Sequence, residues 1–265
     1  MPGIQLLMAP GDKVYQYDGS LAGFYTCIQA CVHTRQIPLA IQTESEAQLN
    51  LFSCRRIGTD SVQAHRVRNA ISDKISPRAL QLCEHVFLSC LVEKELTILR
   101  FLILGFQKGH RIIHFLTDPI VHAMLKTEKS LFGEAHLLSG FIRFSDQEGK
   151  LIAVINPKNY VLPLLAPHFV DRYAMETFLI YDRTHRVALA YERGHAELVG
   201  LEGEFIPDYS EAELFYQALW TQFYQTIAIR ERENHRCRMT HMPKRYWENM
   251  VELRGSSALT QPLPQ

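Results

Sequence analysis

The sequence predicts an α+β protein with a mostly helical N-terminal half, then a β-β-α-β-β-β region and C-terminal helices. Apolar residues recur at helical spacing over most of residues 59–134. From residue 140 the pattern changes to short apolar segments joined by turn sequences, which is typical of strands. We therefore expect a helical region with short strands over residues 1–135, an α+β region over residues 136–254 and a flexible tail over residues 255–265.

The N-terminal elements are a strand, a helix and two short apolar segments. Residues 13–17 alternate polar and apolar side chains, as a strand does. Ser20 then caps a helix that ends before Pro38. Residues 39–42 and 49–54 follow on either side of a polar run, and they predict a hairpin or two edge strands.

Residues 59–134 predict four or five helices. Their breaks are expected at Pro77, near Glu93 and at Gly109, because proline and glycine interrupt helices. Asp118 and Pro119 form a good cap and first-turn pair for a further helix.

The second half predicts strands around a single helix. The turn sequence 146–149 joins the first two strands, and residues 160–173 form the helix. Ser210 caps a long aromatic helix, and Pro243 begins a last short one. The expected strands are residues 140–145, 151–156, 178–181, 187–191 and 197–201.

Composition limits the classes of function. The 265 residues are 47% hydrophobic, and 28 basic side chains balance 28 acidic ones. This charge balance excludes a histone-like DNA coat, so a nucleic-acid site must be local. The six cysteines form no C-x-x-C pair, and Thr34 stands where a cluster motif starting at Cys27 and Cys31 would need its third cysteine. Thiols such as Cys83 and Cys90 are expected to be reduced core residues.

The sequence shows no signal peptide and no membrane-spanning segment. Residues 1–4 carry no basic segment typical of a signal peptide. The apolar stretch 96–106 contains Arg100 and is too short to span a bilayer. We expect a cytoplasmic protein with no membrane partner.

Two segments are locally basic. Residues 55–78 and residues 230–247 each contain six basic and two acidic side chains. The first is interpreted as a solvated helix face. The second ends in aromatic residues and predicts nucleic-acid contact, although solvated faces balanced by the acidic residues 192–213 are an alternative. The predicted contacts are Arg236, Arg238, Lys244, Arg245 and an outward-facing Tyr246, beside a buried Trp247.

A second cluster lies in the α+β half. His168 and Arg172 share a helical face, while Asp182, Arg183 and His185 share a turn. If the C-terminal end of the helix meets that turn, the cluster can bind phosphate through the arginines and use His168 or Asp182 as a catalytic base. The alternative is an Asp-capped turn plus a surface ion pair.

No cofactor or metal centre is predicted. Glycine-rich nucleotide loops, H-E-x-x-H and G-x-S-x-G are absent. A metal site of His168, Asp182 and His185 is a weaker alternative, because no two of them have short ligand spacing. Asp18 and Ser20 form either a turn with a helix cap or an anion site at a helix N-terminus.

Five short motifs stand out in order along the chain. They are Tyr17-Asp18-Gly19-Ser20 with Gly23-Phe24, Gly140-Phe141-Ile142-Arg143-Phe144, the 162–169 segment with Arg172, Ile180-Tyr181-Asp182-Arg183, and Met242-Pro243-Lys244-Arg245-Tyr246-Trp247. Together they resemble one family, the uncharacterised bacterial "probable DNA metabolism protein". The resemblance implies a partner in DNA repair or modification, either a radical-SAM protein or a uracil-DNA-glycosylase-like protein. It also implies a shared working surface of Asp18, His168, Arg172, Asp182, Arg183 and residues 244–247.

Three functions follow as hypotheses. The first is an accessory protein of DNA repair or modification that binds DNA and delivers it to a separate enzyme. The second is an enzyme acting on DNA or a nucleotide. The third is a protein-interaction module.

Overall fold

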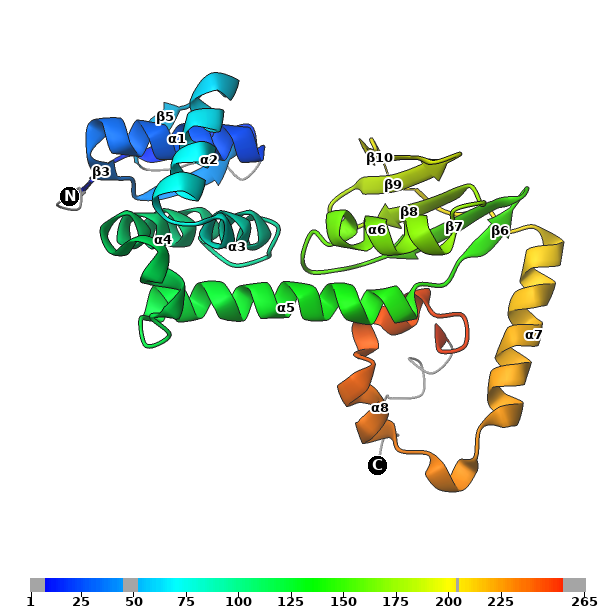
Figure 1. Ribbon diagram of the computed structural model, residues 1–265. Coiled ribbons are helices and arrows are strands. Elements are labelled where there is room, and N and C mark those ends of the chain that lie inside the picture. Colours follow the sequence, from blue (N-terminus) through cyan, green and yellow to red (C-terminus); the bar gives the residue numbers. More distant parts are fainter. Residues whose placement is uncertain (1–7, 45–51, 204, 255–265) are drawn as a thin grey trace. The chain divides into compact units, whose positions relative to one another are not determined.

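The computed structural model describes residues 8–44, 52–203 and 205–254. It is a mixed α/β structure with helices in both halves, which confirms the predicted class (Figure 1). The chain divides into two compact units, Met1–Leu131 and Phe132–Gln265, and the division falls inside helix α5 (Pro119–Phe141). The predicted tail, residues 255–265, lies outside the described residues.

The first unit combines short strands with the predicted series of helices. Its helices are α1 (Leu21–Thr34), α2 (Ser61–Lys74), α3 (Pro77–Phe87), α4 (Lys94–Lys108), the 3₁₀ helix η2 (Gly109–His114) and the first part of α5. Its strands are β1 (Ala9–Pro10), β2 (Val14–Tyr17), β3 (Gln36–Ile37), β4 (Ala40–Thr43) and β5 (Cys54–Arg56). The breaks predicted at Pro77, near Glu93, at Gly109 and at Pro119 are all confirmed.

The two short apolar segments of this unit form edge strands. Both β4 and β5 pair with β2 in parallel, so the hairpin alternative is wrong. Parallel strands need a crossover between them, and helix α1 supplies it between β2 and β4. Residues 49–51 of the second segment lie outside the described residues.

The second unit is built around a five-stranded sheet. Its strands are β6 (Ser145–Gln147), β7 (Lys150–Ile155), β8 (Phe178–Asp182), β9 (Val187–Glu192) and β10 (His195–Gly200). Its helices after α5 are α6 (Leu162–Arg172), α7 (Glu211–Ile227), η3 (Arg230–Arg232), α8 (His235–His241) and η4 (Lys244–Asn249). The predicted β-β-α-β-β-β order is confirmed.

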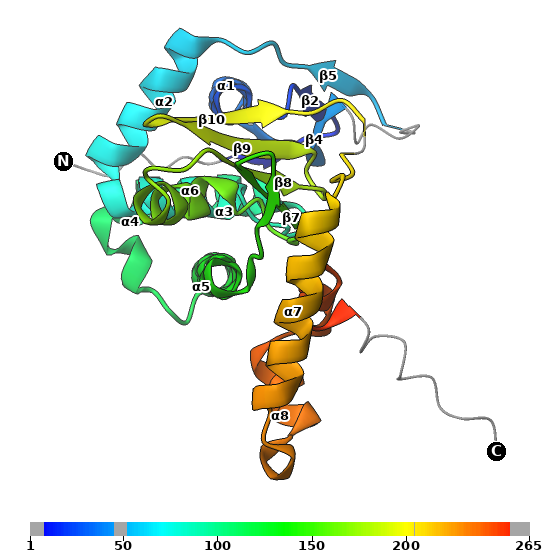
Figure 2. The same ribbon diagram turned by 90° about the vertical axis from the view of Figure 1, so that its right-hand side faces the viewer.

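The order of the strands in space is β10-β9-β8-β7-β6, and only β7 and β8 are parallel to each other. Helix α6 makes the crossover between them, and Figure 2 shows it against the sheet. The turn of the first hairpin has positive φ at Glu148 and Gly149, 53° and 80°. Positive φ at both central residues is the turn geometry that matches strand twist.

One strand prediction is wrong at its start. Gly140 and Phe141 end α5 rather than begin a strand, and β6 starts at Ser145. The helical pattern continues that far because Leu138 is buried at 2% exposure and the Phe141 ring packs 5.9 Å from that of Tyr246.

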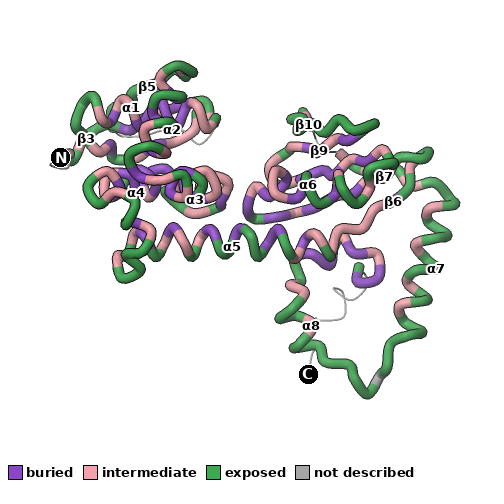
Figure 3. Tube along the Cα trace, viewed as in Figure 1, coloured by how far each residue is buried: buried purple, intermediate pink, exposed green. Residues whose placement is uncertain are grey.

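Helix α7 carries no buried residue, as its exposed trace in Figure 3 shows. Ser210 caps it as predicted, accepting a hydrogen bond from the Glu213 amide. Two polar bonds hold it to the sheet, from Gln217 to the Ser145 hydroxyl (3.2 Å) and from the Asp146 amide to Glu213 (3.0 Å). We call residues 211–241, which contain α7, η3 and α8, the arm.

Among the helices of residues 8–44, 52–203 and 205–254, none has the length and apolar character needed to cross a bilayer.

Candidate functional site

The carboxyl ends of the parallel strands β7 and β8 gather polar side chains. Ligands in α/β proteins commonly bind at such ends, where loops leave the sheet on the same side. The register pairs Ile155 with Asp182, so the residues after each strand emerge side by side. The polar residues there are Asn156, Tyr160, Asp182, Arg183, His185 and Glu248.

Asp182 and His185 form a fixed pair. Asp182 is fully buried, and its Oδ1 accepts from the His185 amide (3.1 Å) while its Oδ2 lies 2.6 Å from His185 Nδ1. The contact of Nδ1 with the Asp182 carboxylate fixes the orientation of the imidazole ring. The His185 side chain is 29% exposed. The pair therefore combines a capped turn with an oriented, reachable imidazole.

Tyr160 packs against this pair, with its ring 5.3 Å from the His185 ring. Burial raises the pKa of Tyr160, and the negative charge of Asp182 raises it further. Both effects disfavour the phenolate, so Tyr160 acts here as a neutral hydroxyl.

Arg183 lies on the opposite face of β8 from Asp182, because side chains alternate along a strand. Its guanidinium donates to Glu248 (3.2 Å), which also accepts from the Asn156 amide (3.3 Å). Arg183 also lines a pocket of about 210 Å³ with Arg143 and Arg254. Sequence reasoning did not select these two arginines as ligands, although Arg143 belongs to one of the quoted motifs.

The structure does not bring the helix end that carries His168 and Arg172 to the turn of residues 182–185. Because β7 and β8 are parallel, α6 runs back along the sheet and its C-terminal end meets the start of β8. Tyr191, paired with Phe178 at that start, donates to the carbonyl of Ala174 just after the helix (3.0 Å). The assumption that this end of the helix lies near the 182–185 turn is wrong.

Both side chains are exposed on α6. The His168 ring meets the Phe169 ring edge-on at 5.0 Å, and the Arg172 guanidinium lies 5.8 Å from the centre of the Tyr173 ring. They contribute packing at the surface of the helix. The alternative of an Asp-capped turn is confirmed, since the His185 amide donates to Asp182.

The C-terminal aromatic pair is structural. Trp247 is buried as predicted, but Tyr246 is also buried, at 2% exposure, so the prediction that it faces outward is wrong. Its hydroxyl donates to Glu134 (3.1 Å), and Arg245 pairs with the same carboxylate (3.0 Å). Lys244 remains exposed, with its ammonium 5.9 Å from the Trp247 ring centre.

Glu134 explains why the pair turns inward. It is 3% exposed and also accepts from the amides of Lys158 and Asn159 (3.1 and 2.8 Å). A buried carboxylate needs such partners, and Tyr246 and Arg245 complete the set. No local pattern in the sequence connects Glu134 with residues more than a hundred positions later.

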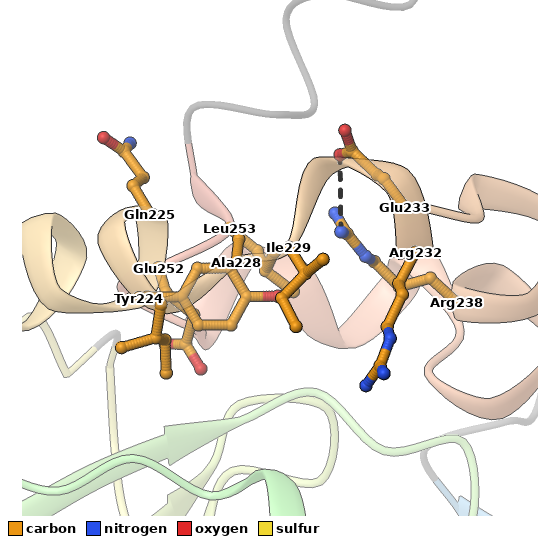
Figure 4. A pocket seen from close by; sticks show the side chains of 10 residues that line it. Tyr224, Gln225, Ala228, Ile229, Arg232, Glu233, Arg238, Glu252 and Leu253 are labelled. Atoms are coloured by element: carbon orange, nitrogen blue, oxygen red, sulfur yellow. Dashed lines mark hydrogen bonds and ion pairs between the residues drawn. The ribbon is translucent and has the colours of Figure 1, made fainter.

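The remaining predicted arginines lie on the arm. Arg236 is exposed on α8, and Arg238 pairs with Glu233 at 3.5 Å. A pocket of about 620 Å³ opens there, which we call the arm pocket (Figure 4). Tyr224 and Gln225 lie on one side, and Arg232, Glu233 and Arg238 on the other. Its lining also includes Ile227, Ala228, Ile229, Glu252 and Leu253.

Asp18 and Ser20 form a helix cap in the first unit. The Ser20 hydroxyl accepts from the Gly23 amide (2.9 Å), and Asp18 accepts from Ser20 and from Thr59 (2.7 Å). A side chain at Gly23 would collide with Asp18 and Thr59, which accounts for the glycine. These polar groups are occupied by one another, as the cap interpretation predicts.

Three of the six basic side chains of the first basic segment, residues 55–78, pair with carboxylates. Arg56 pairs with Glu44 at 2.8 Å, and Arg68 pairs with Glu84 at 3.0 Å. Arg78 holds Glu128. Within the described part of the chain, no three histidine, cysteine or acidic side chains lie close enough to hold a metal ion.

Comparison with known families gives a match, which begins in the first unit and covers most of the second. A family model described as a domain of unknown function, DUF4130, matches residues 92–252. No curated protein matches the sequence. The match covers more than half of the chain, and it includes the ends of β7 and β8 and the whole arm. The chain belongs to the DUF4130 family.

Proposed function

We propose that this protein binds single-stranded nucleic acid through the arm pocket and acts as an accessory of DNA repair or modification. The observation that carries the proposal is the arm pocket itself, in which Tyr224 faces Arg232 and Arg238 across a space of about 620 Å³. Grooves that bind single strands combine aromatic rings for stacking with cations for the backbone.

The charges in the arm pocket favour an anionic ligand. Arg238 is paired with Glu233 at 3.5 Å, and Glu252 is held by Arg143 at 2.8 Å. The lining itself carries Arg232 and Arg238 against Glu233 and Glu252, so a net positive charge arises only together with Arg143, which neutralises Glu252 from outside the pocket. The surrounding segment has six basic and two acidic residues between positions 230 and 247. A planar guanidinium suits contact with a phosphate.

The outer surface of α7 supports a protein partner for this accessory role. Exposed apolar residues recur along the helix, including Phe215 (61%), Tyr216 (66%) and Phe223 (53%). Contiguous exposed apolar surface is typical of protein contacts. The resemblance to DNA metabolism proteins makes a radical-SAM or uracil-DNA-glycosylase-like enzyme the partner we propose.

A second candidate function is an enzyme acting on DNA or a nucleotide. The Asp182–His185 pair favours it, because an imidazole held by a buried carboxylate is a suitable general base. In that case His185→Gln abolishes turnover of the partner-free protein while DNA affinity stays unchanged.

The proposed binding is tested by titrating a fluorescent single-stranded DNA at several salt concentrations. We expect affinity to fall steeply with salt, and Arg232→Gln to lower the log–log slope by about 0.7, the loss of one phosphate contact. Arg193→Gln is the matched control, since its side chain is 91% exposed on a turn away from the arm pocket. Equal slopes for wild type and Arg232→Gln contradict the proposal.

A further inference from the structure

The pocket lined by Arg143, Arg183 and Arg254 lies on the face of the sheet that α6 does not cover. Phe178 contacts Tyr173 just after α6, with ring centres 6.3 Å apart, so alternate residues of β8 point the other way. On that other face Tyr181 packs 5.5 Å from Phe205. We call this 210 Å³ space the sheet pocket; Ile152 and Val154 of β7 also line it.

The Arg143 side chain lines the sheet pocket and is held in place by hydrogen bonds. Its Nε and Nη2 donate to Glu252 (3.1 and 2.8 Å), and its Nη1 donates to the carbonyl of Gly140 (3.0 Å). The Glu252 side chain is only 2% exposed. A guanidinium fixed on several sides presents its charge without needing to be ordered by a ligand.

The other two arginines meet at Glu248. Arg183 donates to the Glu248 carboxylate (3.2 Å), and Arg254 donates through Nε to the Glu248 carbonyl (3.1 Å). The Arg254 guanidinium also lies 5.8 Å from the Tyr209 ring centre. The Glu248 side chain is 66% exposed, so it can leave Arg183 at little cost.

Charge and shape together select the class of ligand. Three guanidinium groups line the sheet pocket, and Glu248, whose side chain is 66% exposed, is a carboxylate that an anionic ligand can displace from Arg183. A phosphate monoester carries nearly two negative charges and three terminal oxygens, which suits forked donors better than a diester does. The apolar strand residues Ile152 and Val154 can receive the sugar or base attached to it.

The sheet pocket and the arm pocket share one segment of chain. Val251 and Arg254 line the sheet pocket, whereas Glu252 and Leu253 line the arm pocket. A nucleic-acid strand bound in the arm pocket therefore lies against residues 251–254, the same segment that lines the sheet pocket.

We propose that the sheet pocket binds a terminal phosphate monoester, supplied by the phosphorylated end of a DNA strand or by a free nucleotide. The nucleic-acid source rests on the proposed function of the arm pocket. The phosphate chemistry rests only on Arg143, Arg183 and Arg254.

The experiment compares short single strands that carry a phosphate or a hydroxyl at the 5′ end, and likewise at the 3′ end, by fluorescence anisotropy with the full chain. We expect one phosphorylated end to bind about tenfold more tightly than its hydroxyl counterpart, as a charge-assisted contact to a dianion provides. Arg183→Gln and Arg254→Gln should each remove that difference. Arg232→Gln should weaken both strands equally.

Glu248→Gln tests the same site in the opposite direction. It removes the carboxylate that competes for Arg183, so affinity for the phosphorylated strand should rise several-fold, a result that misfolding cannot imitate. Thermal melts of each variant accompany the titrations. Arg193→Gln again serves as the control and should match wild type throughout.

The outcomes separate the two proposals. If strands bind but the terminal phosphate adds nothing at either end, the sheet-pocket proposal is wrong and the arm-pocket proposal stands. If no strand binds, the arm-pocket proposal is wrong, and titration with inorganic phosphate and a nucleoside monophosphate by calorimetry decides the sheet pocket. If the wild type binds these phosphates and Arg183→Gln does not, the phosphate site is supported. If the wild type binds neither phosphate, the sheet-pocket proposal is wrong.

Discussion

At the scale of single residues, buried carboxylates organise the second unit. Glu134 collects Tyr246, Arg245 and two backbone amides, and Glu252 collects Arg143 and Trp220. Each is almost fully enclosed, so these donors replace the water that a buried carboxyl group loses. Arg245 and Tyr246, which the sequence analysis predicts as ligand contacts, bind the Glu134 carboxylate of the protein instead.

The aromatic pair of η4 provides a stability prediction. Trp247→Ala should lower the free energy of unfolding by about 3–5 kcal/mol, because a large buried side chain is lost. Tyr246→Phe should cost about 1–3 kcal/mol, because Glu134 loses a donor while the ring is kept. Tyr216→Phe, on an exposed ring of α7, is the control and should be neutral. Denaturant titrations measure all three, and a neutral Tyr246→Phe would show that its hydroxyl does not stabilise Glu134.

Glu252 predicts how stability depends on pH. Burial raises its pKa, but the hydrogen bonds and charge of Arg143 and the Trp220 N–H outweigh burial, so the pKa lies below the ordinary 4.5. A carboxyl group with a lowered folded-state pKa contributes its full stabilisation above the unfolded-state value and loses it as pH falls through the folded-state value. The wild type should therefore lose stability progressively below pH 4.5.

The variant Glu252→Gln tests this contribution directly. It should be less stable than wild type at pH 7 and show a shallower loss in acid, because the titrating group is gone. Glu192→Gln, with a side chain 66% exposed, should keep the wild-type slope. Denaturant midpoints between pH 3 and 7 provide the measurement, and parallel curves for Glu252→Gln and wild type would contradict the assignment.

At the scale of elements, α6 and α7 contrast sharply. Both have apolar sequences of helical period, but Leu165 of α6 is 1% exposed whereas Phe223 of α7 is 53% exposed. Periodicity alone predicts that each helix forms, because it reports an apolar face. Periodicity does not show whether the apolar face of the helix packs against another part of the same chain.

This contrast gives a prediction from a matched pair of variants. Leu165→Ala should cost about 2–5 kcal/mol of unfolding free energy, since it leaves a cavity in the core. Phe223→Gln should change stability by no more than about 0.5 kcal/mol, as exposed substitutions do. Thermal or chemical denaturation checks both. A large loss from Phe223→Gln would mean that α7 is covered within the chain.

Local signals account for most elements that the sequence predicts well. Ser20 and Ser210 cap their helices, and the turn at Glu148 and Gly149 closes the first hairpin as expected. Pairing direction is harder, because a strand as short as β5 carries the same side chains in either direction. Because β7 and β8 are parallel, the C-terminal end of α6 lies at the start of β8. The prediction that this end of the helix meets the 182–185 turn is wrong for that reason.

At the scale of the whole molecule, the cysteines divide into a buried and an exposed group, and the first unit contains members of both. Cys27, Cys31 and Cys83 are buried in the first unit, whereas Cys54, Cys90 and Cys237 are exposed. The expectation that Cys90 is a core thiol is therefore wrong. Burial raises the pKa of Cys27 and Cys31 to about 12 each, and it raises that of Cys83 as well.

Thiol labelling of the intact chain should follow this division. The three exposed cysteines should react quickly with a neutral alkylating reagent, and the three buried ones only when the first unit unfolds. Mass spectrometry across a denaturant series counts the labels and assigns them to peptides. Early labelling of Cys83 in the native protein would contradict its burial.

The two edge strands of the five-stranded sheet, β6 and β10, differ in how open they are to pairing with another copy of the chain. Strand β6 has only three residues, and its Asp146 amide donates a hydrogen bond to Glu213 of α7. At the opposite edge, all six residues of β10 are exposed. A backbone edge left open in this way can accept one more strand. Two copies joined through β10 would each end at a β6 border, so such growth closes at a pair and cannot extend into a fibre.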